Sequence, residues 1–139
     1  CVFLGGGPLP LTAIFAAMER PDTTMTCVDR DERACALSRR LVERLGLSDL
    51  ITVFNGAALD YPYAADDFVI CASLISGKSS LYEKLHQNKL RAFAVRDAEG
   101  AYRYLYEPAP QPEASQYREG GRTQLRSNHI NTTRLYLRA

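Results

Sequence analysis

The chain has 139 residues and a formal net charge of +1, and 46% of its residues are hydrophobic and 24% charged. These values are typical of one soluble globular domain and exclude a disordered chain. No apolar run approaches the roughly 20 residues that span a bilayer, so we expect no membrane partner. A nearly neutral chain is also not suited to bind nucleic acid, which we do not expect as a partner.

Four cysteines lie at positions 1, 27, 35 and 71 and form no CxxC pair. Three of them lie in apolar stretches, so we expect buried free thiols rather than a disulfide framework or a metal site.

The sequence begins at Cys1, with no Met and no signal peptide, directly on a strand with the composition of a core strand. Such a start is expected of a domain cut from a longer chain.

The first half of the chain alternates short apolar runs with segments of helical periodicity. Residues 1–4 predict a buried strand that ends in three glycines, and a helix over 11–18 follows. A second strand over 25–28 ends at Asp29. Apolar residues at every third or fourth position then predict a helix over 31–45, which stops at a glycine.

The second half continues this alternation before its character changes. Strands are expected at 51–54, 67–72, 90–95 and 132–138, with a helix at 79–85. Residues 107–121 contain three prolines and two glycines and are expected to form a long loop. The whole pattern predicts one α/β, Rossmann-like domain over residues 1–139, with a doubly wound, mostly parallel sheet.

The chemistry is expected where the first two strands end. Gly5, Gly6 and Gly7 would let a ligand approach the backbone, and Asp29 follows 22 residues after Gly7, where a carboxylate can accept both hydroxyls of a ribose. Pro10 stands where the G-x-G-x-x-G pattern has its last glycine, which favours a nucleoside without phosphates, such as S-adenosylmethionine, over NAD. The alternative is a tight turn, with Asp29 or Asp31 as a helix N-cap.

Four segments resemble the nicotianamine synthases and the related opine-metallophore synthases. Residues 2–12 (VFLGGGPLPLT) are similar to the GSGPLPLT loop of that family, and residues 96–108 (RDAEGAYRYLYEP) to its RSAHGARAFLYP stretch. Residues 68–78 (FVICASLISGK) resemble its fourth strand and following loop, and residues 130–136 (INTTRLY) its INS-type final strand. The resemblance thus touches most of the chain.

The resemblance implies a fold of the class I S-adenosylmethionine-dependent transferase type. It further implies a cytoplasmic enzyme in metallophore biosynthesis that uses S-adenosylmethionine as co-substrate. Such an enzyme transfers the 3-amino-3-carboxypropyl group to an amine or amino-acid acceptor and releases 5′-methylthioadenosine. A helical domain before residue 1 is implied as well, and that domain would carry part of the acceptor site. The general base, the identity of the acceptor, the number of transfers, a homodimer and the activity of the chain alone stay open.

The same resemblance assigns roles to residues after each strand. The glycine loop would pass beneath the methionine part and ribose of the donor, Asp29 would hold the ribose, and Arg96 would hold a carboxylate of donor or acceptor. For Arg96 a solvated arginine at the end of a strand is the alternative. The expected donor contacts are Gly5, Gly6, Gly7, Pro8, Asp29, Asn55, Gly56, Ala57, Ala72 and Leu74, and the expected acceptor contacts are Ser73, Ile75 and Arg96.

Two other functions are weighed against this one. An ordinary S-adenosylmethionine-dependent methyltransferase would share the fold and the donor site. A non-catalytic nucleotide-binding module would share the glycine loop but would turn over no substrate.

Overall fold

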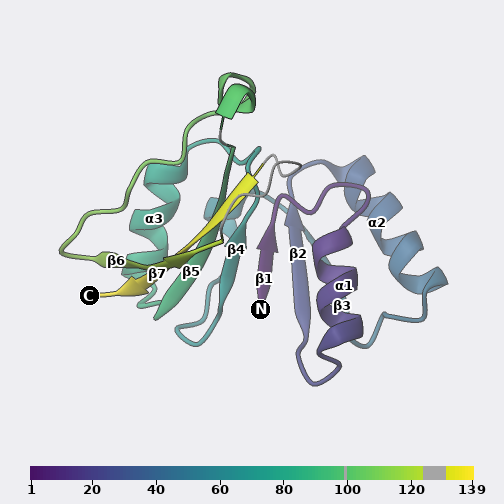
Figure 1. Cartoon of the computed structure of the whole chain (residues 1–139). Helices are drawn as coiled ribbons and strands as arrows, with labels where there is room; N and C mark the ends of the chain where they lie inside the picture. The colour runs from purple at the N-terminus through teal and green to yellow at the C-terminus, as the bar shows by residue number, and fades with distance from the viewer. Residues whose placement is uncertain (99, 124–130) are drawn as a thin grey trace. The chain divides into compact units, whose positions relative to one another are not determined.

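The computed structural model of the chain describes residues 1–98, 100–123 and 131–139. It divides into two compact units, Cys1–Pro62 and Tyr63–Ala139 (Figure 1). No helix among these described residues is long and apolar enough to cross a membrane.

The first unit is a parallel three-stranded sheet with helical connections. Its strands lie in the order β3-β2-β1, and both neighbouring pairs are parallel. The helix α1 connects β1 to β2, and α2 connects β2 to β3, as in βαβ units (Figure 1). The elements are β1 (Val2–Leu4), α1 (Leu11–Glu19), β2 (Met25–Asp29), α2 (Glu32–Arg44), β3 (Ile51–Asn55) and the short 3-10 helix η1 (Ala58–Asp60).

Local sequence explains why these elements begin and end where they do. All three residues of β1 are buried, as in parallel strands that are covered on both faces. Asp31 caps α2, because its side chain accepts a hydrogen bond from the Ala34 N–H at 3.0 Å. Gly46 follows that helix with a φ of 67°, a conformation that glycine adopts without strain. The predicted elements of this unit are therefore confirmed to within a residue or two.

The second unit contains a mixed four-stranded sheet in the order β4-β5-β7-β6. β4 and β5 are parallel, whereas β7 pairs antiparallel with both β5 and β6. Its core surrounds Phe93, whose ring centroid lies 5.0 Å from that of Tyr82, 4.9 Å from Tyr117 and 5.2 Å from Tyr136. The elements are β4 (Val69–Cys71), α3 (Lys78–Gln87), β5 (Ala92–Ala98), the 3-10 helix η2 (Gly100–Leu105), β6 (Tyr117–Arg122) and β7 (Asn131–Arg138).

The expected long loop over 107–121 is wrong in its last part, where β6 begins at Tyr117. Tyr117 is buried, and its hydroxyl donates to the Leu90 carbonyl at 3.1 Å. The rest of β6 is exposed and contains two glycines, so its own sequence indicates a turn. Its strand conformation depends on pairing with β7, which no local pattern shows.

Candidate functional site

The glycine loop after β1 is bonded to the end of β2. The Gly5 N–H donates to the Val28 carbonyl at 2.8 Å, and the Gly7 N–H donates to Asp29 Oδ2 at 2.8 Å. Gly5 and Gly7 have φ angles of 78° and 62°, which favour glycine. The loop and the predicted ribose-binding carboxylate therefore form one hydrogen-bonded unit.

Gly6 packs closely against β2. A Cβ at this position would be 3.1 Å from the Cys27 Cβ, closer than most real contacts of this kind. The backbone of the loop therefore stays close to the sheet edge, where the carboxyl ends of the parallel strands meet. Ligands of open α/β sheets bind at this edge.

Asp29 uses both of its carboxylate oxygens within the protein. Oδ2 accepts from Gly7, and Oδ1 accepts from the Asp31 N–H at 3.0 Å. An ionised carboxylate offers about four acceptor positions, so about two stay available for a ligand diol. The helix-cap alternative holds for Asp31, which caps α2, and does not hold for Asp29.

Asn55 and Gly56 complete this edge of the first unit. The Asn55 Nδ2 donates to the Asp29 carbonyl at 3.1 Å, and the Gly56 N–H donates to the same oxygen at 2.9 Å. The side-chain amide of Asn55 thus braces the end of β2. Ala57 precedes η1, and Pro8 lies exposed in the glycine loop. The structure brings the expected donor contacts of this unit together after β1, β2 and β3.

The remaining expected contacts of the donor and acceptor follow β4 in the second unit. Ser73 is buried, Ala72 and Ile75 are half-buried, and the Leu74 side chain is 80% exposed. The Ser73 hydroxyl is buried without a hydrogen-bond partner among the described residues. This loop therefore presents one large apolar side chain outward and keeps an unpaired hydroxyl inside.

Lys78 is the residue that sequence reasoning missed at this loop. It opens α3 and is fully buried, and its ammonium donates to the Ser73, Ile75 and Glu107 carbonyls at 3.0, 2.6 and 3.2 Å. A lysine normally indicates a solvated side chain, because burying its charge is costly. Only the fold reveals that the loop wraps around this ammonium.

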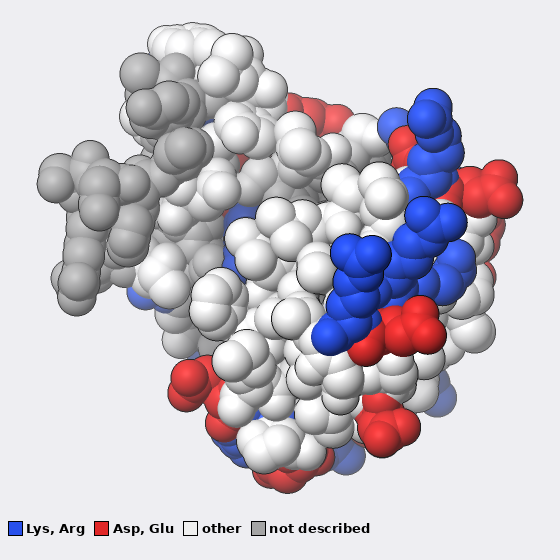
Figure 2. All heavy atoms as spheres, turned by 90° about the vertical axis from the view of Figure 1, so that its right-hand side faces the viewer, with Lys and Arg blue, Asp and Glu red and all other residues white. Residues whose placement is uncertain are grey.

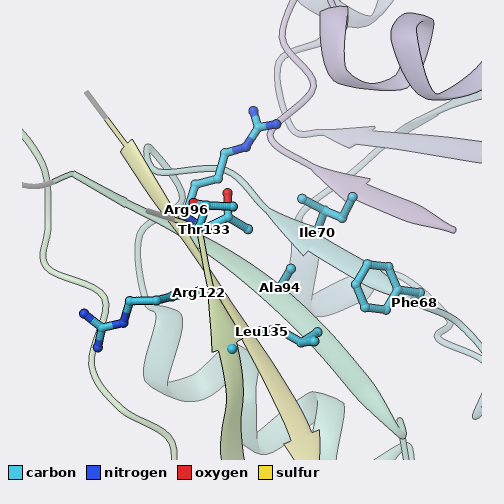
Figure 3. Close-up of a pocket in the computed structure, with 9 residues that line it drawn as sticks. Phe68, Ile70, Ala94, Arg96, Arg122, Thr133 and Leu135 are labelled. Atoms are coloured by element: carbon cyan, nitrogen blue, oxygen red, sulfur yellow. Dashed lines mark hydrogen bonds between the residues drawn. The ribbon is translucent and has the colours of Figure 1, made fainter. Parts of the chain in front are cut away.

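Arg96 lies within β5 and not at its end as expected, because the strand continues to Ala98 and pairs Arg96 with Thr133 of β7. The residue lines an open groove of about 430 Å³ whose apolar part includes Ile70, Ala94 and Leu135. Figure 3 shows its guanidinium extending away from these apolar side chains. Burial lowers the pKa of Arg96 from its usual range.

The cysteines have no arrangement for metal binding or nucleophilic chemistry. All four are free thiols, and three of them are buried. Burial raises the pKa of Cys27 and of Cys71 to about 12, so both thiols stay protonated at neutral pH. No group of three or more His, Cys, Asp or Glu in the described ranges is placed to hold a metal ion.

The sequence matches no family model and no curated relative. Solved structures show that the chain has the Rossmann-like fold of class I S-adenosylmethionine-dependent methyltransferases. One of them is an RNA methyltransferase from Salinibacter ruber in complex with S-adenosyl-L-homocysteine, with a TM-score of 0.73 and 14% identity over 98% of this chain and 78% of that one. The predicted fold class is confirmed.

The chain is also similar to a particular enzyme, the nicotianamine synthase MtNAS. Its structure in complex with MTA and tNA matches with a TM-score of 0.82 and 25% identity, over 99% of this chain and 52% of that one. A variant of MtNAS in complex with S-adenosylmethionine matches with a TM-score of 0.80 and 26% identity, over 99% and 53%. The predicted resemblance is confirmed, and the chain spans about half the length of MtNAS.

Proposed function

We propose that the chain is the donor-binding part of a transferase that moves the 3-amino-3-carboxypropyl group of S-adenosylmethionine to an amine. The main observation behind the proposal is that the glycine loop is bonded to Asp29, because the Gly7 N–H donates to the Asp29 carboxylate at 2.8 Å. It is supported by the similarity over 99% of the chain to MtNAS, whose structures hold S-adenosylmethionine in one case and MTA and tNA in another. In this proposal the enzyme serves metallophore biosynthesis.

The donor would lie across the carboxyl ends of β1, β2 and β3. Gly5, Gly6 and Gly7, followed by Pro8, would pass beneath its methionine part and ribose, and the three glycines have no Cβ that would keep it away from the backbone. The free acceptor positions of Asp29 suit the two ribose hydroxyls. The backbone at Gly56 and Ala57, together with Asn55, would contact the adenine.

The loop after β4 and Arg96 would serve the reacting end of the donor and the acceptor. Ala72 and the exposed Leu74 would supply apolar contacts to the donor, and Ser73 and Ile75 would contact the acceptor. The guanidinium of Arg96 can pair with a carboxylate of the donor or of an amino-acid acceptor.

The reaction is a displacement at carbon. The lone pair of the acceptor amine attacks the methylene carbon of the 3-amino-3-carboxypropyl group that is bonded to the sulfonium sulfur. The carbon–sulfur bond breaks, its electron pair goes to sulfur, and neutral 5′-methylthioadenosine leaves. The new bond joins nitrogen and carbon, and the proton of the attacking amine passes to a general base. Because all three carbons on the sulfonium are activated, the geometry of binding selects which one reacts.

An ordinary methyltransferase is the second candidate, because the chain shares its fold with such enzymes. The two candidates differ in the nucleoside that they release from S-adenosylmethionine. We expect 5′-methylthioadenosine when the protein is incubated with S-adenosylmethionine and candidate amino acids, as measured by liquid chromatography and mass spectrometry. S-adenosylhomocysteine as the product would overturn the proposal in favour of the methyltransferase.

Calorimetric titration with S-adenosylmethionine tests the shared premise of both enzymes. We expect saturable binding by the folded chain. No heat of binding from a chain that circular dichroism shows to be folded would contradict both candidates. Binding without any turnover, in a protein that also carries the expected helical domain, would favour the non-catalytic module.

A further inference from the structure

Lys78 is a buried cation whose hydrogen-bonding capacity is fully used by one loop and one distant residue. Its side chain has no exposed surface, and its three N–H groups match the carbonyls of Ser73, Ile75 and Glu107. No ion pair among the described residues includes Lys78. Because all three donors are engaged, the ammonium has none left for a ligand.

Such a residue is costly to keep in a core. Burying an ammonium loses several kcal/mol of hydration, and an apolar side chain of similar size is often as stable or more stable in its place. The position at the start of α3 adds an unfavourable interaction with the helix dipole. A role beyond packing therefore accounts for Lys78 better than stability does.

The three bonds determine the conformation of the loop after β4. The carbonyls of Ser73 and Ile75 both face the ammonium, and the side chain of Leu74 between them is exposed. Glu107 holds the same loop from the other direction, because its Oε1 accepts from the Gly77 N–H at 3.2 Å while its carbonyl accepts from Lys78. The loop and the segment after η2 are thus joined at two points.

We propose that Lys78 is a positioning residue that holds residues 72–77 in the conformation required to bind the donor. The inference rests on the proposed function, in which this loop contacts S-adenosylmethionine. Lys78 itself touches neither donor nor acceptor. It acts by fixing the backbone on both sides of the exposed Leu74.

The test replaces Lys78 by methionine, which has a similar length and no donors. We expect Lys78→Met to weaken binding of S-adenosylmethionine about tenfold by calorimetry, at a temperature where the variant is folded. Amide hydrogen exchange at Ile75 and Gly77 should accelerate by about the same factor. The matched control is Lys84→Met on the same helix, whose side chain makes none of these contacts, and it should change neither quantity.

A second pair of variants covers the case in which Lys78→Met does not fold. Glu107 is exposed, so Glu107→Ala should fold while it removes the acceptor of the Gly77 N–H. We expect about threefold weaker binding from Glu107→Ala and restored binding from Glu107→Gln, which keeps a carbonyl oxygen at this position.

The outcomes separate this inference from the proposed function. If the unchanged chain binds S-adenosylmethionine and a folded Lys78→Met variant binds it equally well, the positioning role is overturned and the proposed function stands. Unchanged affinity in a folded Glu107→Ala variant would overturn the part of the inference in which Glu107 holds the loop from its side chain, because that variant keeps the three hydrogen bonds of Lys78. No binding by the unchanged chain would overturn the proposed function, and the positioning role with it.

Discussion

Asp29 stands at the centre of the candidate site because its two oxygens organise the backbone on both sides. One oxygen accepts from Gly7 and the other from Asp31, so the carboxylate is oriented before any ligand binds. We predict that Asp29→Asn weakens binding of S-adenosylmethionine by about tenfold or more, because the amide presents a donor where an acceptor is needed. Calorimetric titration measures this change.

Asp31→Asn is the matched control for this prediction. Asparagine caps a helix as well as aspartate does, so the bond to the Ala34 N–H should survive and donor affinity should stay unchanged. Equal losses of affinity in the two variants would show that charge near the site, and not the carboxylate of Asp29, determines binding.

A second prediction concerns the stability of a variant at Gly6. A Cβ would meet the Cys27 Cβ at 3.1 Å, so Gly6→Ala should move the loop and lower the free energy of unfolding by about 1–3 kcal/mol. Gly121→Ala is the control, since a Cβ there has no heavy atom within 4 Å, and its effect should stay within about 0.5 kcal/mol. Urea unfolding compares the two. Equal stability of both variants would contradict the close approach at Gly6.

At the scale of the elements, β2 and β4 each bury a cysteine, and this makes stability depend on alkaline pH. In the unfolded chain the pKa of a thiol lies near 9.0, whereas burial raises the pKa of Cys27 and of Cys71 to about 12. Below about pH 9 both states are protonated, and the pH has no effect through these groups. Between about pH 9 and 12 only the unfolded thiols ionise, so the free energy of unfolding falls.

The expected loss is about 1.4 kcal/mol per pH unit for each of the two thiols. Urea unfolding of the wild type across this pH range checks the slope. The variant with Cys27→Ala and Cys71→Ala should show a correspondingly smaller slope, although its stability at neutral pH is lower. An unchanged slope in that variant would show that other groups dominate the alkaline transition.

The elements also show how far the sequence determines the fold and the site. The strands and helices of the first unit follow from local signals such as the apolar run before Gly5 and the Asp31 cap, and they are confirmed. β6 escapes prediction because its exposed residues gain strand conformation only by pairing with β7. The burial of Lys78 could not be predicted either, since the Glu107 carbonyl that it binds lies 29 residues away in the sequence.

At the scale of the whole molecule, positive and negative charges nearly balance. The net charge is +1, and Figure 2 shows that basic side chains gather on one face with acidic ones beside them. The exposed arginines of α2 belong to a helix that also carries Glu32 and Glu43. The structural similarity to an RNA methyltransferase concerns the fold alone, because the two sequences are only 14% identical.

The central claim concerns which carbon of S-adenosylmethionine is transferred. The most direct measurement supplies the donor with a heavy-isotope label either in the methyl group or in the methylene of the 3-amino-3-carboxypropyl group that is bonded to sulfur, and follows each label by mass spectrometry. We expect the methylene label in the amine product and the methyl label in 5′-methylthioadenosine. A methyl label in the product, with the methylene label kept in S-adenosylhomocysteine, would contradict this expectation.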